Sequence, residues 1–252
     1  MPQPFFSLAR RGLLRLDKVS MPARNSRKKY TENGYYHIYN RGVEKRIIFE
    51  DAQDYAVFLS YLKQYLTSKN TDLLQDKLSN PSTTYKEKAK IIKELRLNNF
   101  ADEISVIAYC LMPNHFHFLV KQKNATSIDL FMNSIGTRYT MYFNKKYKRV
   151  GSLYQGVYKA VLIESDEQLL HLTRYIHLQA LEVSTSQGEA LQIQLSSYEN
   201  YTGKQNTNWV KPNDILAFFS KRNPLLSYSA FVNGNTNTKM DNVDISNIII
   251  EN

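Results

Sequence analysis

The residues of this chain best suited to chemistry are two histidines separated by one position, His115 and His117. They lie in an apolar segment, residues 109–120, that predicts a strand, and strand residues two apart project from the same face. Phe116 and Phe118 then take the opposite face and can enter a core, while both imidazoles point outward together. The pair is half of a metal site, although an incidental pair on a surface strand is the alternative for an isolated His-x-His.

A second polar group follows on a predicted helix. The Ser-Asp-Glu-Gln sequence at 165–168 matches a capping box and predicts a helix over 166–181. Residues four apart share a helix face, so His171, Tyr175 and Gln179 form a polar row. Taken alone, such a row is also typical of the solvent face of an amphipathic helix.

Combined with the histidine pair, this row indicates phosphoryl chemistry. Tyr175 offers a phenolic oxygen that could attack phosphorus, and Gln179 offers a carbonyl oxygen that could complete a three-ligand cation site with His115 and His117. A phenol with a pKa near 10 is a weak nucleophile, and a divalent metal helps by stabilising charge on the phosphoryl oxygens. The product is a phosphotyrosine. Mg²⁺ or Mn²⁺ suits these ligands, and imidazoles would also accept zinc.

The charge of the chain indicates a polyanionic partner. Among 252 residues, 33 are basic and 23 acidic, giving a net charge of +10. Nucleic acid is the leading partner and a membrane surface the alternative, but apolar segments such as 104–112 are too short to span a bilayer. We expect no membrane partner and a cytoplasmic protein. The single Cys110 agrees with a reducing compartment, and its place in an apolar strand predicts a buried thiol.

The order of predicted elements indicates the fold class. An α+β, ferredoxin-like split βαβ domain with an antiparallel sheet accounts for this order, followed by the helix that carries Tyr175. The predicted strands and helices occur in the order strand 35–40, helix 51–66, strands 104–112 and 115–121, helix 126–146 and strand 158–163.

The remaining segments surround this pattern. Residues 1–33 are expected to be a flexible basic extension, 34–182 the catalytic domain, and 183–252 a partly disordered C-terminal extension. The polar, lysine-rich residues 67–100 predict a loop and a charged helical hairpin inserted into the domain. A short helix is expected over 214–220.

One stretch has the composition of a surface that binds single strands. Residues 138–159 contain six basic residues, six aromatic residues and no acidic ones. Cations can follow phosphates while aromatic rings stack on exposed bases. Arg138 and Tyr154 are predicted contacts, whereas several other aromatics of the stretch lie within the predicted helix and belong to the core.

Four motifs in order resemble the single-tyrosine HUH transposases, and among them the REP-associated tyrosine transposases of bacteria. The resemblance covers about residues 34–179. It rests on Tyr36-His37-Ile38-Tyr39-Asn40-Arg41-Gly42, Met112-Pro113-Asn114-His115-Phe116-His117, Gly151-Ser152-Leu153-Tyr154-Gln155-Gly156 with Tyr158-Lys159-Ala160, and Arg174-Tyr175-Ile176-His177-Leu178.

This resemblance implies a site and a substrate. His115 and His117 would bind the metal, Tyr175 would be the nucleophile, and single-stranded DNA would be cut next to a hairpin, such as one formed by inverted repeats, through a 5′-phosphotyrosine. Within the matching motifs, the expected DNA contacts are Asn40, Arg41, Gln155, Lys159 and Arg174. The oligomeric state, monomer or homodimer, is left open.

The chain departs from the family pattern at three places. Gln179-Ala180 stands where the REP-associated branch often has Asn-Pro, although relatives in the smallest insertion sequences use Gln as the third ligand. Val157 stands where the family often has Arg, and the insertion at 67–100 is longer than expected.

Two other functions compete with a transposase. A single-tyrosine nicking initiator of replication or conjugation needs the same residues, but it usually works with a helicase, and no Gly-x-x-x-x-Gly-Lys phosphate loop occurs here. A non-catalytic hairpin-binding protein would keep the fold without the chemistry. The presence of Tyr175 together with His115 and His117 argues against a pure binder.

Overall fold

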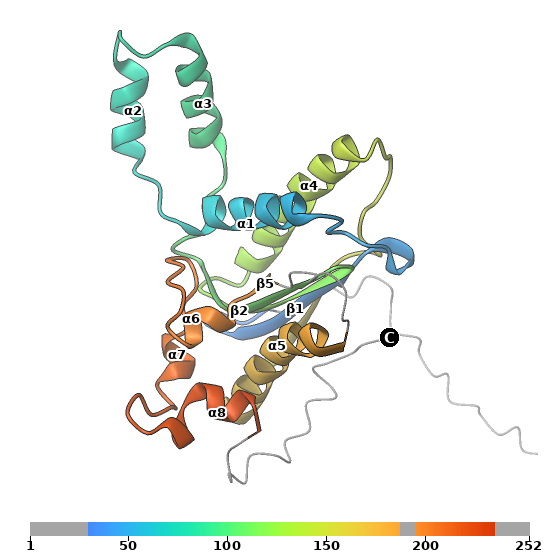
Figure 1. Ribbon diagram of the computed structural model, residues 1–252. Helices are drawn as coiled ribbons and strands as arrows, with labels where there is room; N and C mark the ends of the chain where they lie inside the picture. The colour runs from blue at the N-terminus through green and yellow to red at the C-terminus, as the bar shows by residue number, and fades with distance from the viewer. Residues whose placement is uncertain (1–29, 187–194, 235–252) are drawn as a thin grey trace, which may run out of the picture.

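The computed structural model describes residues 30–186 and 195–234. Its centre is a five-stranded sheet in the order β4-β1-β3-β2-β5, in which every neighbouring pair is antiparallel (Figure 1). The order of the first four strands is that of the split βαβ arrangement, so the predicted fold class is confirmed. The strands are β1 (Tyr35–Arg41), β2 (Ile104–Met112), β3 (His115–Gln122), β4 (Lys159–Ile163) and β5 (Leu195–Ser196).

Helices cover both faces of this sheet. Figure 1 shows α1 (Ala52–Leu66) and α4 (Ser127–Lys146) on one face, and α5 (Asp166–Ser186) on the other. The expected helix after β4 is therefore present and continues a little beyond its predicted end. The shorter helices, η for 3₁₀ turns, are η1 (Val43–Lys45), α6 (Tyr198–Tyr201), α7 (Asn213–Leu216), η2 (Pro224–Leu226) and α8 (Tyr228–Val232).

The alternation of strand residues produces two cores. Phe116 and Phe118 pack with α1 and α4 in the first core, whereas Leu119 packs with Leu172 and Ile176 of α5 in the second. The second core corrects one expectation, because the face that carries the histidine pair is not turned outward but is covered by α5. Both faces of the sheet can be apolar because each has a helix layer to bury it.

The insertion forms a helical arm, as predicted. Helices α2 (Thr71–Ser79) and α3 (Tyr85–Arg96) pack side by side and extend away from the sheet (Figure 1). The two ends of the arm meet at its base, where the Asn99 side chain donates a hydrogen bond of 2.8 Å to the Thr67 carbonyl oxygen. Because its ends are close together, the arm is inserted without disturbing the path from α1 to β2.

The chain after α5 adds to the domain more than the sequence indicated. Strand β5 extends the sheet beside β2, and the Trp209 ring stacks on Tyr109 with 5.4 Å between ring centroids. Tyr228 and Phe231 of α8 are buried in the second core. The expected helix over 214–220 is shorter and begins at Asn213. Predictions for residues 1–29 and 235–252 lie outside the described residues. Among the described helices, none has the length and apolar character needed to cross a bilayer.

Candidate active site

The two histidines of the His-x-His pair lie at the start of β3, next to the end of β1. In the sheet register, His115 is opposite Arg41 and His117 is opposite Tyr39. Directly opposed residues project from the same face, so these four side chains share the face that α5 covers. The two imidazole rings are close, with 5.0 Å between centroids and an angle of 88° between planes.

His117 has the environment of a metal ligand. Its side chain is buried, and its Nδ1 lies 2.9 Å from Nε2 of His37, a completely buried histidine of β1. Among the described residues, Nε2 of His117 has no hydrogen-bond partner. A buried nitrogen with an unused lone pair is unfavourable unless something binds it, so this atom fits a cation.

The protonation of His117 also suits a ligand. Burial, together with the neighbouring charges of His37, His115 and Arg41, holds the pKa of His117 well below its ordinary value. The imidazole is therefore neutral at pH 7, which is the form that binds metals. When its Nδ1 carries the proton and donates to His37, its Nε2 presents the lone pair.

The neighbouring residue Asn114 selects the corresponding nitrogen of His115. Nδ1 of His115 lies 2.6 Å from the side-chain oxygen Oδ1 of Asn114, which can only accept a hydrogen bond. Nδ1 therefore carries the proton and donates, and Nε2 is the nitrogen with the lone pair. Both histidines are thus oriented through Nδ1, as is usual for metal-binding histidines, whose second nitrogen is held by a hydrogen bond.

Helix α5 brings Tyr175 to this pair. Its first turn is capped by Ser165, whose Oγ accepts a hydrogen bond from the Gln168 backbone N–H. In a capping box the Gln168 side chain would accept from the Ser165 N–H. Here it accepts from the Glu164 N–H instead. Three turns later the ring of Tyr175 meets that of His117 edge to face, with 5.6 Å between centroids and 86° between planes. Tyr175 is partly buried in the second core.

Gln179 is placed one helical turn beyond Tyr175 on the same side of the sheet. It is partly exposed, on the helix that packs against β2 and β3. Its role as third ligand stays a prediction. In the described parts of the chain, no three side chains from His, Cys, Asp and Glu gather as a metal-binding group, so a cation here depends on two imidazoles plus ligands of another kind.

Several predicted DNA contacts lie around the histidine pair. Lys159 is exposed and pairs with Tyr39, so it belongs to the same face as His117. The loop that contains Gln155 is held against the end of β1, because the Gln155 N–H donates to the Arg41 carbonyl at 2.9 Å and the Asn40 side chain donates to the Gly156 carbonyl at 3.2 Å. Sequence motifs more than 100 residues apart therefore form one rim.

The structure corrects the prediction for Tyr154 and Arg138. Tyr154 is only 8% exposed and packs edge to face against Phe116 in the first core, so its ring is not available to a base. Arg138 lies on α4, on the opposite face of the sheet from the histidine pair. Its guanidinium stacks 3.7 Å from the centroid of the Tyr61 ring and donates to Gln64. Both residues lie in the basic and aromatic stretch, but the loop packs Tyr154 into the core, and α4 holds the half-exposed Arg138 against α1.

Arg174 is also held by the protein. Its Nε donates to the Val232 carbonyl at 3.2 Å, and its guanidinium lies over the Phe231 ring. These contacts join α5 to α8. Arg174 thus anchors the helix that carries Tyr175, which differs from the direct DNA contact expected from the sequence.

Helix α5 carries two further histidines, His171 and His177. His177 is completely buried, with Nδ1 2.5 Å from the Tyr228 hydroxyl and Nε2 2.8 Å from the Ser197 hydroxyl. Burial lowers the pKa of His177 to about 3, so the ring is neutral and structural. His171, part of the predicted polar row, is buried and meets the Phe231 ring.

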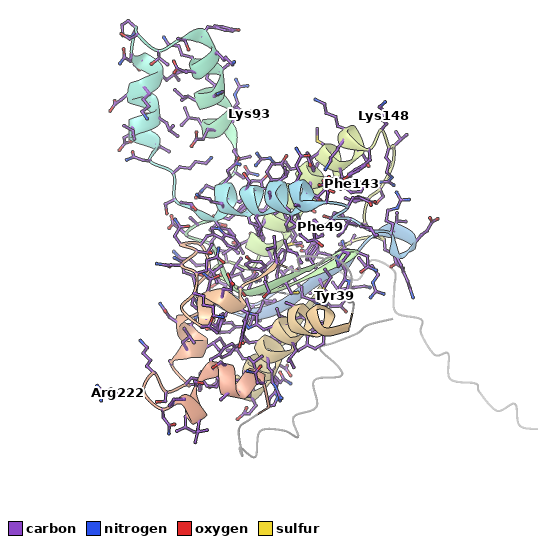
Figure 2. The ribbon with its side chains drawn as sticks, viewed as in Figure 1. Tyr39, Phe49, Lys93, Phe143, Lys148 and Arg222 are labelled. Carbon is purple, nitrogen blue, oxygen red and sulfur yellow. The ribbon has the colours of Figure 1, made fainter. Side chains whose placement is uncertain are left out.

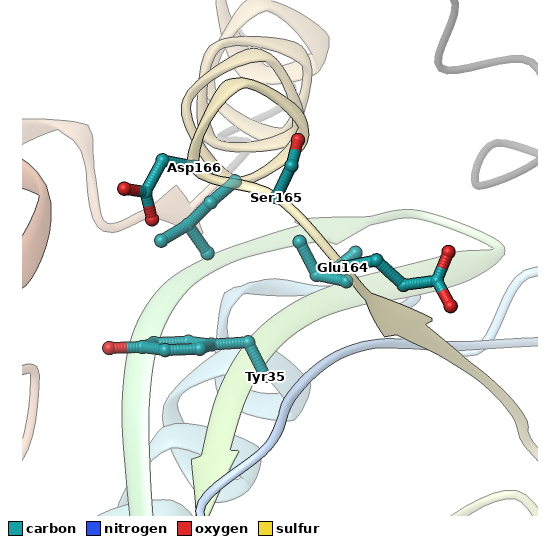
Figure 3. A pocket seen from close by; sticks show the side chains of 6 residues that line it. Tyr35, Glu164, Ser165 and Asp166 are labelled. Carbon is teal, nitrogen blue, oxygen red and sulfur yellow. The ribbon is translucent and has the colours of Figure 1, made fainter.

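A shallow hollow of about 320 Å³ lies elsewhere, where β4 leads into α5. Figure 3 shows Tyr35, Glu164, Ser165 and Asp166 around it. Tyr35 begins β1, whereas Arg41, the neighbour of His115, ends it. At about 3.3 Å per strand residue, the two places are roughly 20 Å apart. The hollow is therefore separate from the histidine pair.

Sequence reasoning missed His37 and Asn114, which orient the two histidines. His37 is part of the first family motif, but nothing in a single sequence shows that a residue of β1 will meet one 80 positions later. Asn114 directly precedes His115, and an amide beside a histidine on a tight turn is a local signal that could have been used.

Residues 80–179 match the family of IS200-like transposases. The matched part is 100 of the 252 residues. The match includes the histidine pair and Tyr175 and ends at Gln179, so it supports the family that the four sequence motifs predicted. No curated protein matches the sequence.

Two solved structures are similar to this chain in part. One is a REP-associated tyrosine transposase bound to a REP hairpin, at 9% identity and a TM-score of 0.41, covering 74% of this chain and 96% of the other. The second is a protein assigned as a transposase from Deinococcus radiodurans R1, at 16% identity and a TM-score of 0.25, covering 62% and 97%. Both TM-scores are below 0.5, so the support for the predicted family comes from the sequence match over residues 80–179.

Proposed function

We propose that this protein is a transposase that cuts and rejoins single-stranded DNA next to a hairpin, with Tyr175 as the nucleophile. The observation that carries the proposal is the contact between the Tyr175 ring and His117, whose buried Nε2 has no hydrogen-bond partner among the described residues. A nucleophile beside an unused metal-binding nitrogen is the arrangement that phosphoryl transfer to a tyrosine needs.

The residues fit a divalent cation, Mg²⁺ or Mn²⁺. Nε2 of His115 and of His117 would hold it, with the carbonyl oxygen of Gln179 as third protein ligand. When bound, such a cation stabilises the negative charge that develops on the phosphoryl oxygens. With Nδ1 of His117 donating to His37 and Nδ1 of His115 donating to Asn114, the two imidazoles would take the tautomer whose Nε2 carries the lone pair.

The chain's own groups account for the remaining steps. The Tyr175 oxygen attacks phosphorus and forms an O–P bond, the phenolic proton passes to solvent, and the bond from phosphorus to the 3′ oxygen breaks. The 3′ oxygen takes up a proton and leaves as a hydroxyl, so the 5′ phosphate remains on Tyr175. Attack by another 3′ hydroxyl reverses these steps and rejoins DNA. Lys159 and Arg41, on the same face, supply positive charge for the backbone phosphates.

The substrate would be a hairpin formed by inverted repeats in DNA. The enzyme would therefore act in the cytoplasm, at the bacterial nucleoid. A homodimer stays a prediction.

The decisive experiment is the covalent adduct. Incubation with a hairpin oligonucleotide and Mn²⁺ should give a protein–DNA band that resists denaturation. Tyr175→Phe removes one oxygen while it keeps the ring, so it should fold, bind DNA and give no band. The matched controls Tyr154→Phe and Tyr158→Phe should retain it.

The outcomes separate the competing functions. An adduct that persists in Tyr175→Phe would exclude the proposed nucleophile. Hairpin binding without any adduct from the unmodified protein would favour a non-catalytic binder. Nicking without transfer to a second 3′ end would favour a nicking initiator.

A further inference from the structure

The outer face of helix α3 in the helical arm carries an unusual concentration of positive charge. Lys86, Lys90, Lys93 and Arg96 follow one another at spacings of four, three and three residues, so they lie on one side of the helix. All four are exposed, and none takes part in the ion pairs found among the described residues. We call these four residues the arm face.

The arm does not need this face for its own folding. Ile91 is buried on the other side of α3, where the helix packs on α2, and Thr84 with Glu87 closes a capping box at its start. Lys93 and Arg96 lie in the last turn, where positive charge suits the helix dipole, but Lys86 in the first turn and Lys90 in the middle gain nothing from that dipole. The protein leaves these four charges exposed to solvent, so they can attract a polyanionic partner.

Aromatic surface lies beside the charge. Tyr85, the first residue of α3 at the outer end of the arm, is 91% exposed. An exposed tyrosine next to lysines is typical of surfaces that follow phosphates and contact bases.

We propose that the arm face binds the phosphate backbone of DNA that lies outside the hairpin. This inference rests on the proposed action on hairpin DNA. From Lys86 to Arg96 the helix rises about 15 Å, and phosphates of one strand recur about every 3.4 Å along a duplex, so the arm face matches about four phosphates.

The position of the arm defines which DNA it can reach. Figures 1 and 2 show α3, with Lys93 on it, extending from the side of the sheet that α1 and α4 cover, whereas α5 lies on the other side. Tyr175 of α5 meets His117 on that other side. DNA held at the candidate active site therefore meets the arm only where it continues beyond the hairpin, and the contribution of the arm must depend on DNA length.

The test compares three DNA probes with two sets of variants. The probes are a minimal hairpin, the same hairpin with a flank of about 20 base pairs, and the same hairpin with a single-stranded flank of equal length. Lys86→Gln, Lys90→Gln and Lys93→Gln are combined in one variant. The control combines Lys204→Gln, Lys211→Gln and Lys221→Gln, which removes the same charge from exposed lysines of the C-terminal segment.

The expected result is specific to the arm and to the flank. The arm variant should bind a flanked hairpin about tenfold or more weakly at low salt, and its salt dependence should lose about one unit of slope per lost phosphate contact. The minimal hairpin should be bound as before, and the control variant should change binding to all three probes equally and slightly. The flanked probe whose affinity falls more in the arm variant identifies the form of DNA that the arm prefers.

Equal affinity of the arm variant and the unmodified protein for both flanked probes would overturn the proposal, as would an equal loss in the arm and control variants. Circular dichroism shows whether the arm variant remains folded. The covalent adduct on the minimal hairpin is measured separately and should be unchanged in the arm variant. Its absence in the unmodified protein would count against the proposed function and leave the binding comparison intact.

Discussion

Nε2 of His37 and Nδ1 of His117 lie 2.9 Å apart in the interior, joined across two neighbouring strands. Their rings are nearly parallel, with 5.1 Å between centroids and 18° between planes. This pair connects the first family motif to the predicted metal ligands. Its consequence is that the direction of the His117 lone pair is decided by a residue that is not itself a ligand.

Replacing His37 should therefore weaken the metal site without removing a ligand. His37→Ala leaves Nδ1 of His117 without its partner, and Mn²⁺ affinity should fall about 10- to 100-fold. Isothermal titration with Mn²⁺ measures this directly. Tyr39→Phe, which keeps the ring 4.9 Å from His37, is the control and should leave the affinity unchanged. An unchanged affinity in His37→Ala would show that His37 does not orient the ligand.

Loss of Arg138 should affect stability and not DNA binding. Its guanidinium stacks on Tyr61 and donates to Gln64 on the face opposite the histidine pair, so Arg138→Ala should lower the free energy of unfolding by about 1 kcal/mol. Hairpin affinity should stay within about twofold after correction for the folded fraction, because one lost surface charge has a small general effect. Lys159→Ala is the comparison and should weaken hairpin binding. A large loss of affinity in Arg138→Ala would restore its predicted role as a DNA contact.

Acid should destabilise the fold through His177. Burial lowers the pKa of this histidine to about 3, whereas in the unfolded chain it is near 6.5, so between these values the unfolded state binds a proton that the folded state does not. The free energy of unfolding should therefore fall as the pH drops from about 6.5 toward 3, by about 1.4 kcal/mol per pH unit from this group.

The test of this pH dependence is a non-titrating replacement. His177→Gln should give a smaller slope between pH 6.5 and 5 in urea unfolding, a range in which most carboxylates remain charged. His117, whose pKa is also lowered, keeps its own contribution in both proteins. Identical slopes would mean that His177 is protonated in the folded protein.

The form of DNA should matter for binding. A single-stranded or hairpin oligonucleotide should bind more tightly than a blunt duplex, and affinity should fall steeply with salt because basic residues release counterions. Fluorescence anisotropy over a range of salt concentrations measures both effects. Equal affinity for hairpin and blunt duplex would contradict recognition of single strands.

The sequence alone determined the residues of the candidate site and the faces on which they lie. The two-residue period of β3 places His115 and His117 together, and the four-residue spacing of α5 places Tyr175 and Gln179 together. These relationships are local, because they depend only on the geometry of one strand or one helix. Each strand and helix was likewise predicted from its local pattern, and their order along the chain was enough to predict the fold class.

Only the tertiary structure decided which faces meet. Strand pairing brought His37 to His117, and the packing of α5 turned the histidine face from solvent into a buried layer. On the other face of the sheet, packing against Phe116 buried Tyr154, and contacts with α8 held Arg174, although both residues were expected to contact DNA. A periodic pattern shows which side chains share a face but not what covers that face. That depends on contacts between residues far apart in the chain, each chosen by the shape and apolar area of the whole core.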